Sequence, residues 1–508
     1  MTQDTAHIAV VGGGTAGWLA ALVLRKNDPK VRISVIEAPD IPTVGVGEGS
    51  TAVLRQVMRE LGIDEADFLR ETGATFKFGI FHQGWRADGG SYFGPIDDPN
   101  ALAPPPPGAP SNWLHQSQIA AGKPIAPLHL FTALMRAGKS PYARKPGGDQ
   151  IALSPFDYAY HFDQARLGRF LATRAIGIDH IRAEVTAPIR DTETGHITHL
   201  ALKSAPDLPV DLVIDCTGFR RAIIGKMGAG WTSYKDFLPL NKAMPFWLPH
   251  LPDKEISPYT LARALGSGWM WGIPVADRVG CGYVFSDAHL TTEAAQAEVE
   301  AALGHPIDPR GVLSIDPGRL DDAWVGNCIA IGLAQSFLEP LEATSIHGSL
   351  VQILLLTKIG LDQIMGPQAA THRDRYNATA RCQIDDFAQF INLHYAGGRT
   401  DTAFWRDMTG SGLSDISKDR LTYWQENPLL ARDFPSFPGG LPHVEEQLYL
   451  PVLDGLGLLP RAPAKAIQAT AQQRMAARKT REKMVREFRS AMIAAIGHRK
   501  YLQQISIR

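Results

Sequence analysis

A glycine-rich turn near the start of the chain places the strongest constraint on the fold. Residues 7–11 are a short apolar run typical of a strand buried in a parallel sheet, and Gly12, Gly14 and Gly17 follow at once. Residues 18–24 then have the composition of a helix. In this arrangement the first glycine permits a tight turn, the second lets the backbone approach a pyrophosphate, and the third lets helix and strand pack closely. The pattern therefore predicts a Rossmann-like module.

A second strand and an acidic residue complete the pattern. Residues 31–36 form another apolar strand that ends at Glu37, whose carboxylate is suited to accept hydrogen bonds from ribose hydroxyls. The start of the intervening helix favours phosphate charge. A tight turn with a purely structural role is the alternative, and the motif alone does not separate FAD from NAD. We expect a dinucleotide to contact Gly12, Gly14, Thr15, Ala16, Gly17 and Glu37.

A double-tryptophan segment is the second distinctive feature. Trp269 and Trp271 are followed directly by Gly-Ile-Pro, which ends at Pro274. On a strand, a spacing of two residues points both indoles to one face of the sheet. A buried aromatic ladder would explain this segment by itself, so its meaning depends on the rest of the chain.

Together, the two motifs resemble those of the flavin-dependent halogenases, in which a Trp-x-Trp-x-Ile-Pro signature accompanies a glycine-rich FAD site. The resemblance extends over roughly residues 7–410 and includes the segments 45–51, 215–219, 282–286 and 337–346. Gly49 departs from the commoner form of the first of these segments. The resemblance implies FAD as the cofactor, with further contacts at Val185, Leu333 and Ile346.

The family's essential lysine corresponds to Lys77. Phe76, Phe78 and Ile80 alternate around it, which predicts one half-buried strand with Lys77 on the opposite face. A lysine at a strand edge with its amine in water is the structural alternative. The resemblance implies that Lys77 holds an oxidised halogen, either by a hydrogen bond or as a haloamine. A desolvated pocket would lower its pKa and favour the neutral amine.

The family's second catalytic residue corresponds to Glu342, whereas Glu339 is expected to be structural. Glu342 precedes a helix expected to begin near Ser345, with an apolar face formed by Ile346, Leu350, Ile353 and Leu354. A carboxylate favoured only by the helix dipole is the alternative. Thr344 and Ser345 match the family's halide site and lie where a helix N-terminus would bind an anion.

The resemblance also implies a mechanism. FADH2 delivered by a separate flavin reductase reacts with dioxygen to a flavin hydroperoxide, which oxidises bromide or chloride to hypohalous acid. Lys77 positions the halogen for attack by an electron-rich aromatic ring, and Glu342 either polarises the electrophile or removes the ring proton as a general base. Trp269 and Trp271 form a wall between flavin and substrate. A flavin-dependent monooxygenase of the same fold is the alternative enzyme, and a flavin-binding sensor is the non-enzymatic alternative.

The segment 444–449 bears on the substrate. Tryptophan halogenases usually carry an aromatic pair here that helps to clamp the amino acid, but this chain has one aromatic residue, Tyr449. We therefore expect an indole-type aromatic substrate, such as an indole derivative, in preference to free tryptophan.

Composition excludes several other classes. The formal net charge of −1 gives no reason to expect nucleic-acid binding, and no apolar run approaches the length of a membrane span. Four widely spaced cysteines argue against a zinc site, so no metal is expected. The first residues show no signal-peptide pattern, which leads us to expect a soluble cytoplasmic protein, as a monomer or homodimer.

The 508 residues are long enough for two parts. We expect an α/β fold with an FAD-binding Rossmann-like module of the flavin monooxygenase type over residues 1–350. Within it, inserted strands carry Lys77 and the double-tryptophan motif. A mainly helical, substrate-side extension is expected over residues 351–508.

Overall fold

A mostly parallel six-stranded sheet forms one side of the protein. The computed structural model describes residues 5–40, 47–144, 150–434, 436–467 and 470–506. The sheet's strand order is β10 (Asp179–Arg182), β2 (Arg32–Glu37), β1 (His7–Val11), β14 (Leu212–Asp215), β23 (Cys328–Ala330) and β22 (Trp324–Val325). Only β22 runs antiparallel to its neighbour. The predicted Rossmann-like module is confirmed.

The glycine turn joins β1 to α1 (Thr15–Asn27). Gly12 has φ +118°, and a Cβ there would lie 2.4 Å from the carbonyl oxygen of Cys216 on the neighbouring strand's loop. A Cβ on Gly17 would lie 1.9 Å from the carbonyl oxygen of Gly12. Both positions therefore exclude a side chain, as the tight turn and the close helix packing require.

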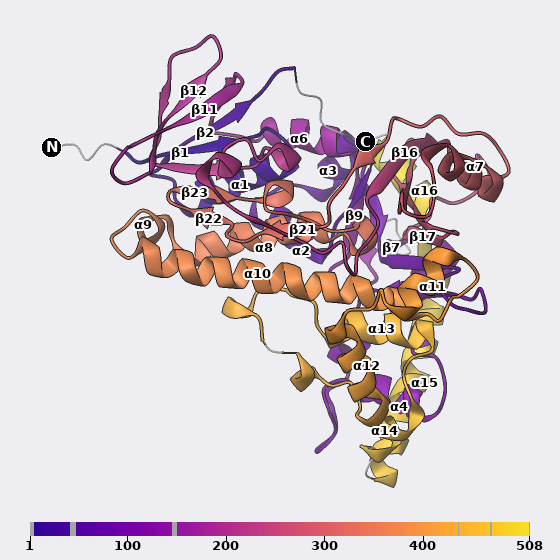
Figure 1. Ribbon diagram of the computed structural model, residues 1–508. Coiled ribbons are helices and arrows are strands. Elements are labelled where there is room, and N and C mark those ends of the chain that lie inside the picture. Colours follow the sequence, from indigo (N-terminus) through magenta and orange to yellow (C-terminus); the bar gives the residue numbers. More distant parts are fainter. Residues whose placement is uncertain (1–4, 41–46, 145–149, 435, 468–469, 507–508) are drawn as a thin grey trace.

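A seven-stranded sheet forms the other large layer, to the right in Figure 1. Its order is β20 (Leu313–Ser314), β16 (Lys242–Leu248), β19 (Val279–Phe285), β18 (Gly268–Pro274), β17 (Thr260–Ala264), β5 (Gly79–Gln83) and β6 (Ser91–Pro95). All seven residues of β18 are buried. Trp269 and Trp271 lie in one apolar cluster and Met270 in another, which confirms that both indoles share a face.

The described residues also form four three-stranded sheets. The first has the order β3 (Glu48–Gly49), β9 (Ala159–Phe162) and β4 (Thr75–Lys77), and the second has the order β11 (Val185–Arg190), β12 (Ile197–Leu202) and β13 (Leu208–Pro209). The third has the order β15 (Trp231–Ser233), β21 (Gly318–Leu320) and β24 (Ser336–Phe337), and the fourth has the order β25 (Ala495–Gly497), β7 (Lys139–Arg144) and β8 (Gln150–Ala152).

The predicted single strand around Lys77 is wrong. Lys77 ends β4 in a three-stranded sheet, whereas Ile80 lies on β5 in the seven-stranded sheet. Phe78 lies between them, and its backbone bonds to Pro258 and Ile96 instead of continuing either ladder. Phe76, Lys77 and Phe78 are all buried, so the alternation of residue types does not separate a solvent-exposed face from a buried face.

Helices cover the sheets and build most of the C-terminal part. The long helix α10 runs beneath both layers in Figure 1, and α4, α12, α13, α14 and α15 gather below the seven-stranded sheet. The main helices are α2 (Ala52–Glu60), α3 (Glu65–Thr72), α4 (Trp113–Ala120), α5 (Leu130–Ala137), α6 (Gln164–Ala172), α7 (Thr292–Leu303), α8 (Thr344–Ile359), α10 (Ala369–Leu393), α11 (Ala403–Gly410), α12 (Asp415–Glu426), α13 (Glu446–Leu456), α14 (Arg461–Ala466), α15 (Ala471–Ala494) and α16 (His498–Ser506). The mainly helical C-terminal extension is thus confirmed.

The C-terminal part is joined closely to the rest. The boundary expected at residue 350 falls inside α8, and β25 pairs with β7 from the first third of the chain. Met484 and Phe488 of α15 are buried in the same apolar cluster as Ile8 and Val10 of β1. Among the described residues, no helix combines the length and the apolar character needed to cross a membrane.

Candidate active site

The glycine turn leaves room for an anion at the start of α1. A Cβ placed on Gly14 would meet nothing within 4 Å. Gly14 is also the N-cap residue of α1, where no side chain caps the helix and no acidic residue lies in the first turn. The first amides of α1, at Thr15 and Ala16, therefore have the open, electropositive surroundings that suit a pyrophosphate, and the turn fits a dinucleotide cofactor such as FAD.

The other expected cofactor residues lie around this turn to different degrees. Glu37 ends β2, and its carboxylate accepts a hydrogen bond from His180 Nε2 at 2.8 Å. Val185 packs against the apolar cluster that contains Val11 and Ile36. Leu333 lies in the short helix Gly332–Ala334, where a Cβ on Gly332 would approach Ala16 to 3.2 Å.

Ile346 differs from these residues. Its side chain is buried in the main apolar cluster, together with Leu350 and Ile353 of the same helix. This placement confirms the predicted apolar face of α8 and gives the Ile346 side chain a structural role.

Lys77 is a buried cation. Lys77 is only 3% exposed, and its Nζ donates a hydrogen bond to the carbonyl oxygen of Ser50 at 3.0 Å. A Cβ on Gly49 would lie 3.0 Å from Nζ, so the glycine that departs from the family segment makes room for the amine. Burial lowers the pKa of Lys77 to about 8, although the charges of Glu342 and Glu48 oppose this shift.

Glu48 is the first of the two carboxylates that act on Lys77. It lies on β3, directly before Gly49, and accepts a hydrogen bond from the Gln164 amide. Burial raises its pKa to about 7, and the bonds from Gln164 and from the Ser345 hydroxyl, together with the charge of Lys77, limit that rise. The preceding residues of the family segment, Gly45 and Val46, lie outside the described residues.

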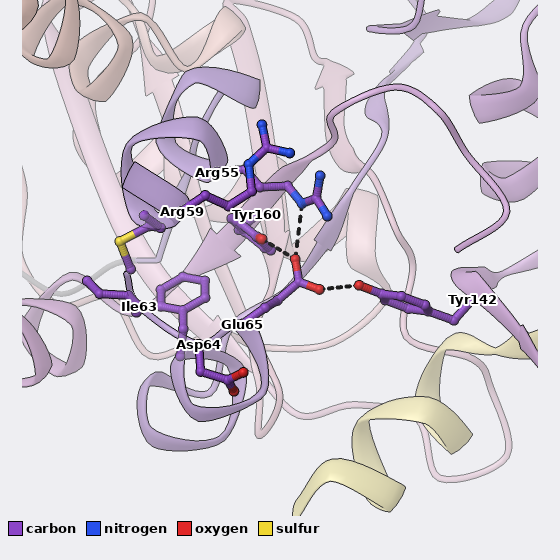
Figure 2. A pocket seen from close by; sticks show the side chains of 9 residues that line it. Arg55, Arg59, Ile63, Asp64, Glu65, Tyr142 and Tyr160 are labelled. Atoms are coloured by element: carbon purple, nitrogen blue, oxygen red, sulfur yellow. Dashed lines mark hydrogen bonds and ion pairs between the residues drawn. The ribbon is translucent and has the colours of Figure 1, made fainter. Parts of the chain in front are cut away.

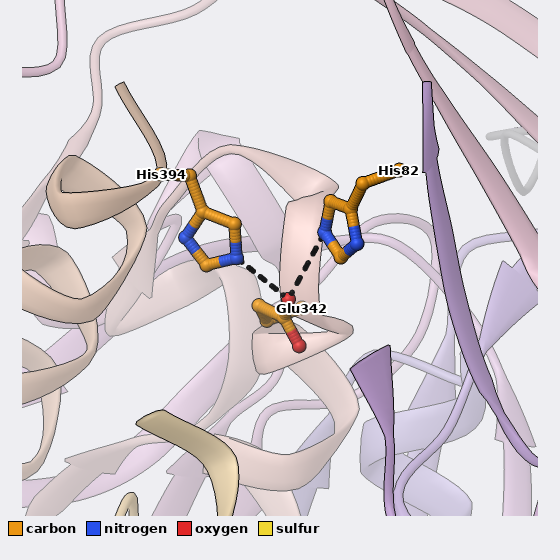
Figure 3. A group of neighbouring side chains, drawn as sticks. All are labelled: His82, Glu342 and His394. Carbon is orange, nitrogen blue, oxygen red and sulfur yellow. Dashed lines mark hydrogen bonds and ion pairs between the residues drawn. The ribbon is translucent and has the colours of Figure 1, made fainter. Parts of the chain in front are cut away.

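Glu342 is the second carboxylate, and two histidine rings point toward it (Figure 3). His394 Nε2 lies 2.9 Å and His82 Nε2 3.6 Å from Glu342 Oε1. Burial would raise the pKa of Glu342, but the hydrogen bond from His394 and the close approach of the His82 ring lower it to about 2. Burial also lowers the pKa of His82 to about 4. Glu342 is therefore held as a carboxylate at neutral pH.

Glu339 lies next to Glu342 in sequence but has different partners. Its Oε2 accepts hydrogen bonds from Trp269 Nε1 at 3.1 Å and from the Tyr395 hydroxyl at 2.5 Å. Burial raises its pKa to about 7. The contacts support a structural role for Glu339, because this carboxylate fixes the Trp269 indole.

The two tryptophans of β18 lie side by side with ring centroids 6.4 Å apart. The Trp271 ring covers Gly282 of β19, where a Cβ would come within 2.1 Å of it. Trp271 Nε1 is buried and makes no hydrogen bond to the described residues. The pair thus has one indole anchored by Glu339 and one whose N–H has no partner among the described residues.

The start of α8 has open amide groups. Thr344 is the first helical residue, and Ala343 before it has φ 55°, a left-handed conformation that is unfavourable for a residue with a side chain. No side chain caps this terminus and its first turn holds no acidic residue, as expected for an anion site at Thr344 and Ser345.

A separate cavity of about 250 Å³ lies on the other face of the β4–β9 ladder (Figure 2). The hydroxyls of Tyr142 and Tyr160 donate to Glu65, which also forms an ion pair with Arg55. These partners satisfy the carboxylate, and none of the expected site residues lines the cavity.

Glu48, His82 and His394 received no role from the sequence. Glu48 could have been found from its place in the family segment 45–51. No local pattern gives His82 and His394 a role, and they meet Glu342 because β5, the short helix Pro340–Glu342 before α8 and the turn His394–Ala396 after α10 converge.

Comparisons with known proteins agree with this geometry. A family model described as tryptophan halogenase matches residues 7–472. Tryptophan 6-halogenase SttH from Streptomyces toxytricini is 30% identical over 502 residues, which cover 92% of each protein. A solved structure of a tryptophan halogenase from Shewanella frigidimarina superposes with a TM-score of 0.89 at 26% identity, covering 100% of this chain and 98% of the other.

BrvH, a flavin-dependent halogenase from Brevundimonas sp. BAL3, superposes with a TM-score of 0.84 at 29% identity, covering 99% of each chain. These matches confirm the family and the enzyme class that the motifs indicated. The chain belongs to the tryptophan halogenase family of flavin-dependent enzymes.

Proposed function

We propose that this enzyme halogenates an electron-rich, indole-type aromatic ring, with Lys77 and Glu342 as its catalytic residues. The observation that carries the proposal is a buried lysine under the charges of two carboxylates, Glu48 and Glu342. The Ser345 hydroxyl at the start of α8 bonds to Glu48, which brings the anion site next to the lysine. A cation, a base and an anion site are the parts that electrophilic halogenation needs.

The glycine turn of Gly12 to Gly17 would hold the FAD pyrophosphate, and Glu37 the ribose. When bound as FADH2, supplied by a separate flavin reductase, the cofactor provides with dioxygen the oxidising power that converts halide to hypohalous acid. Every other step belongs to the residues of the chain.

The amides of Thr344 and Ser345 bind the halide in this scheme. Lys77 already donates one hydrogen to Ser50, so its remaining N–H groups are available to hold hypohalous acid at one point. Glu342, ionised and fixed by His394, accepts the proton that the ring loses after the halogen adds. The O–X bond of hypohalous acid breaks in this step, and the displaced hydroxide takes up a proton and leaves as water. Trp269 and Trp271 keep the organic substrate apart from the oxidant.

The substrate proposal rests on the segment that would clamp free tryptophan. Its one aromatic residue, Tyr449, is fully buried, and its hydroxyl accepts a hydrogen bond from Arg420 at 2.7 Å. Tyr449 also packs on Phe390 and Phe434, so its ring belongs to the core and is not free to hold a substrate. An indole compound without a bound amino-acid group therefore fits better than tryptophan itself.

Mass spectrometry of a reconstituted reaction tests the function. Indole is incubated with enzyme, FAD, a flavin reductase, NADH and either chloride or bromide. We expect a halogenated product whose mass follows the halide that was added. A hydroxylated product that forms equally well without halide would instead establish a monooxygenase.

The variant Lys77→Met tests the catalytic assignment. We expect it to lose aromatic halogenation, while FAD binding persists because the glycine turn is untouched. Lys242→Met, on β16 away from the site, is a matched control that should keep wild-type activity. Product formation by Lys77→Met at the wild-type rate would disprove the role of Lys77.

A further inference from the structure

The His82 ring is buried without a hydrogen-bond partner. Its side chain is 0% exposed, and neither ring nitrogen makes a hydrogen bond to the described residues. The ring stacks on Tyr92 with a centroid distance of 4.5 Å, which fixes its plane. Figure 3 shows one nitrogen pointing to the Glu342 carboxylate, 3.6 Å away. A buried polar group of this kind lacks the partner that its desolvation normally requires.

The His394 ring is fixed in a particular tautomer. Its Nδ1 lies 2.9 Å from the carbonyl oxygen of Phe390, which can only accept, so Nδ1 carries a hydrogen. In the neutral ring Nε2 then presents a lone pair to Glu342 Oε1 at 2.9 Å. Two lone pairs face each other there unless a proton or a cation lies between them. A carbonyl that holds one ring nitrogen while the other points inward is the usual support of a metal-ligating histidine.

We propose that His82, Glu342 and His394 bind one divalent transition-metal cation, with Zn²⁺ as the best fit. Two neutral imidazoles and one carboxylate are ligands that zinc accepts, whereas Mg²⁺ and Ca²⁺ prefer oxygen ligands alone. One ligand atom from each residue lies within 4.8 Å of the other two. Zinc in a tetrahedron needs ligand atoms about 3.4 Å apart, so shifts on the order of 1 Å close the site.

The surrounding residues determine how strongly this site binds a metal ion and whether an ion can reach it. Both imidazoles are buried, but the Glu342 side chain is 13% exposed, which leaves an approach for an ion. Three protein ligands leave one zinc position open. The nearby charge of Lys77 opposes a second cation, so binding should be reversible and weaker than at a structural zinc site.

Occupation of the site would inhibit the enzyme. This consequence rests on the proposed function, in which Glu342 accepts the ring proton. A metal-bound carboxylate has lost its basicity and cannot accept that proton. The binding itself does not depend on the reaction and is measured separately.

The first measurement is a Zn²⁺ titration of the full-length, chelator-treated enzyme in competition with a chromogenic indicator. We expect one saturable site. His82→Phe, which keeps the stacking on Tyr92, and Glu342→Gln should each weaken binding roughly tenfold or more. His305→Ala removes an exposed histidine far from the cluster in sequence and should bind as the wild type does.

Thermal unfolding of each variant without metal confirms that the variant is folded. If His82→Phe is not folded, His394→Gln is used in its place. Absence of a saturable site, or equal affinity in the wild type and the ligand variants, would overturn the proposal. Equal affinity would place the bound Zn²⁺ elsewhere on the protein, whereas absence of a saturable site would leave a proton between Glu342 and His394.

The second measurement compares three halogenation rates: without Zn²⁺, with Zn²⁺, and with Zn²⁺ after a chelator has been added. The reductase rate at the same zinc concentration serves as the control. We expect inhibition that the chelator reverses, in the same concentration range as binding. Saturable binding without inhibition would retain the metal site but contradict the role of Glu342 in the proposed function.

Discussion

Burial of the Lys77 amine lowers the stability of the folded protein but brings the pKa of the amine closer to neutral pH. The surrounding protein removes the amine from water, which lowers its pKa from 10.5 to about 8. Glu48 and Glu342 compensate for only part of this loss of hydration. The folded protein therefore carries a charge at neutral pH that it would be more stable without, and the proposed catalytic use of Lys77 gives a reason why the charge is kept.

Replacing Lys77 by Met should stabilise the protein in a pH-dependent way. The folded pKa is lower than the unfolded one, so the penalty is complete below about pH 8 and disappears as the pH rises toward 10.5. A shift from 10.5 to about 8 corresponds to about 3 kcal/mol. Lys77→Met should raise the free energy of unfolding by up to this amount at pH 7 and by much less at pH 10.

Urea denaturation at several pH values measures this difference. Lys242→Met, at a partly exposed position, serves as the control and should show no comparable trend. A Lys77→Met gain that grows between pH 8 and 10 would contradict the assigned direction of the pKa shift.

At the scale of elements, β18 carries the two tryptophans proposed as the wall between flavin and substrate, and its neighbours hold them in place. Trp271→Phe keeps an aromatic ring against Gly282 but removes the N–H that has no described partner. We expect less halogenated product per FADH2 consumed, because oxidant escapes through a looser wall. The loss of stability should be about 1–3 kcal/mol.

Trp324→Phe is the matched comparison, because Trp324 is equally buried but lies at the edge of the six-stranded sheet. Its coupling ratio should equal that of the wild type. If Trp271→Phe also keeps the wild-type ratio, the indole pair is a structural ladder.

The start of α8 is the second element with a testable role. Ser345→Asp would place a negative charge in a first helical turn that now holds none. We expect the apparent KM for halide to rise about tenfold or more, because like charges repel strongly at a partly buried site. Ser345→Asn, which is neutral and similar in size, should change the KM far less. Halide-dependence curves with bromide and with chloride compare the two variants.

Elements with a strong local signal could be predicted from the sequence, whereas their convergence could not. The glycine turn, β18 and α8 each contain the residues that determine them, within a few positions of one another. The surroundings of Lys77 depend on Pro258 and Ile96, which bond to Phe78 and separate two strands that the alternation had joined. His394 lies 52 positions from Glu342 and His82 lies much further away in the sequence, so no local pattern indicates that the three residues meet.

At the scale of the whole molecule, the proposed preference for indole over tryptophan rests on how the C-terminal helices pack. Tyr449 of α13 fills the space between α10 and α12 and is held by Arg420. We expect faster initial halogenation of indole than of free tryptophan, and bromide should work at least as well as chloride because it is easier to oxidise. Product should form mainly at C3 of indole, since the ring lacks contacts that would orient another carbon.

Initial rates with both substrates and both halides measure this preference, and product isolation gives the position of the halogen. Faster turnover of tryptophan, with substitution at a single benzo-ring carbon, would show that another part of the chain supplies an amino-acid clamp.

The chain passes from one sheet to another at Phe78, and this limits where related genes can be recombined into an active chimaera. Lys77 belongs to the sheet of β3, β9 and β4, and Ile80 belongs to the sheet that contains the tryptophan wall. A chimaera with a crossover between these two residues would take β4 from one parent and β5 from the other, and so divide the bend at Phe78 that sets the two strands relative to each other. Viable crossovers should lie in exposed turns such as Pro104–Pro107, which leave residues 75–83 in one parental block. In libraries shuffled from relatives of this enzyme, active clones should therefore inherit that block intact, even where the segments on either side are freely exchanged.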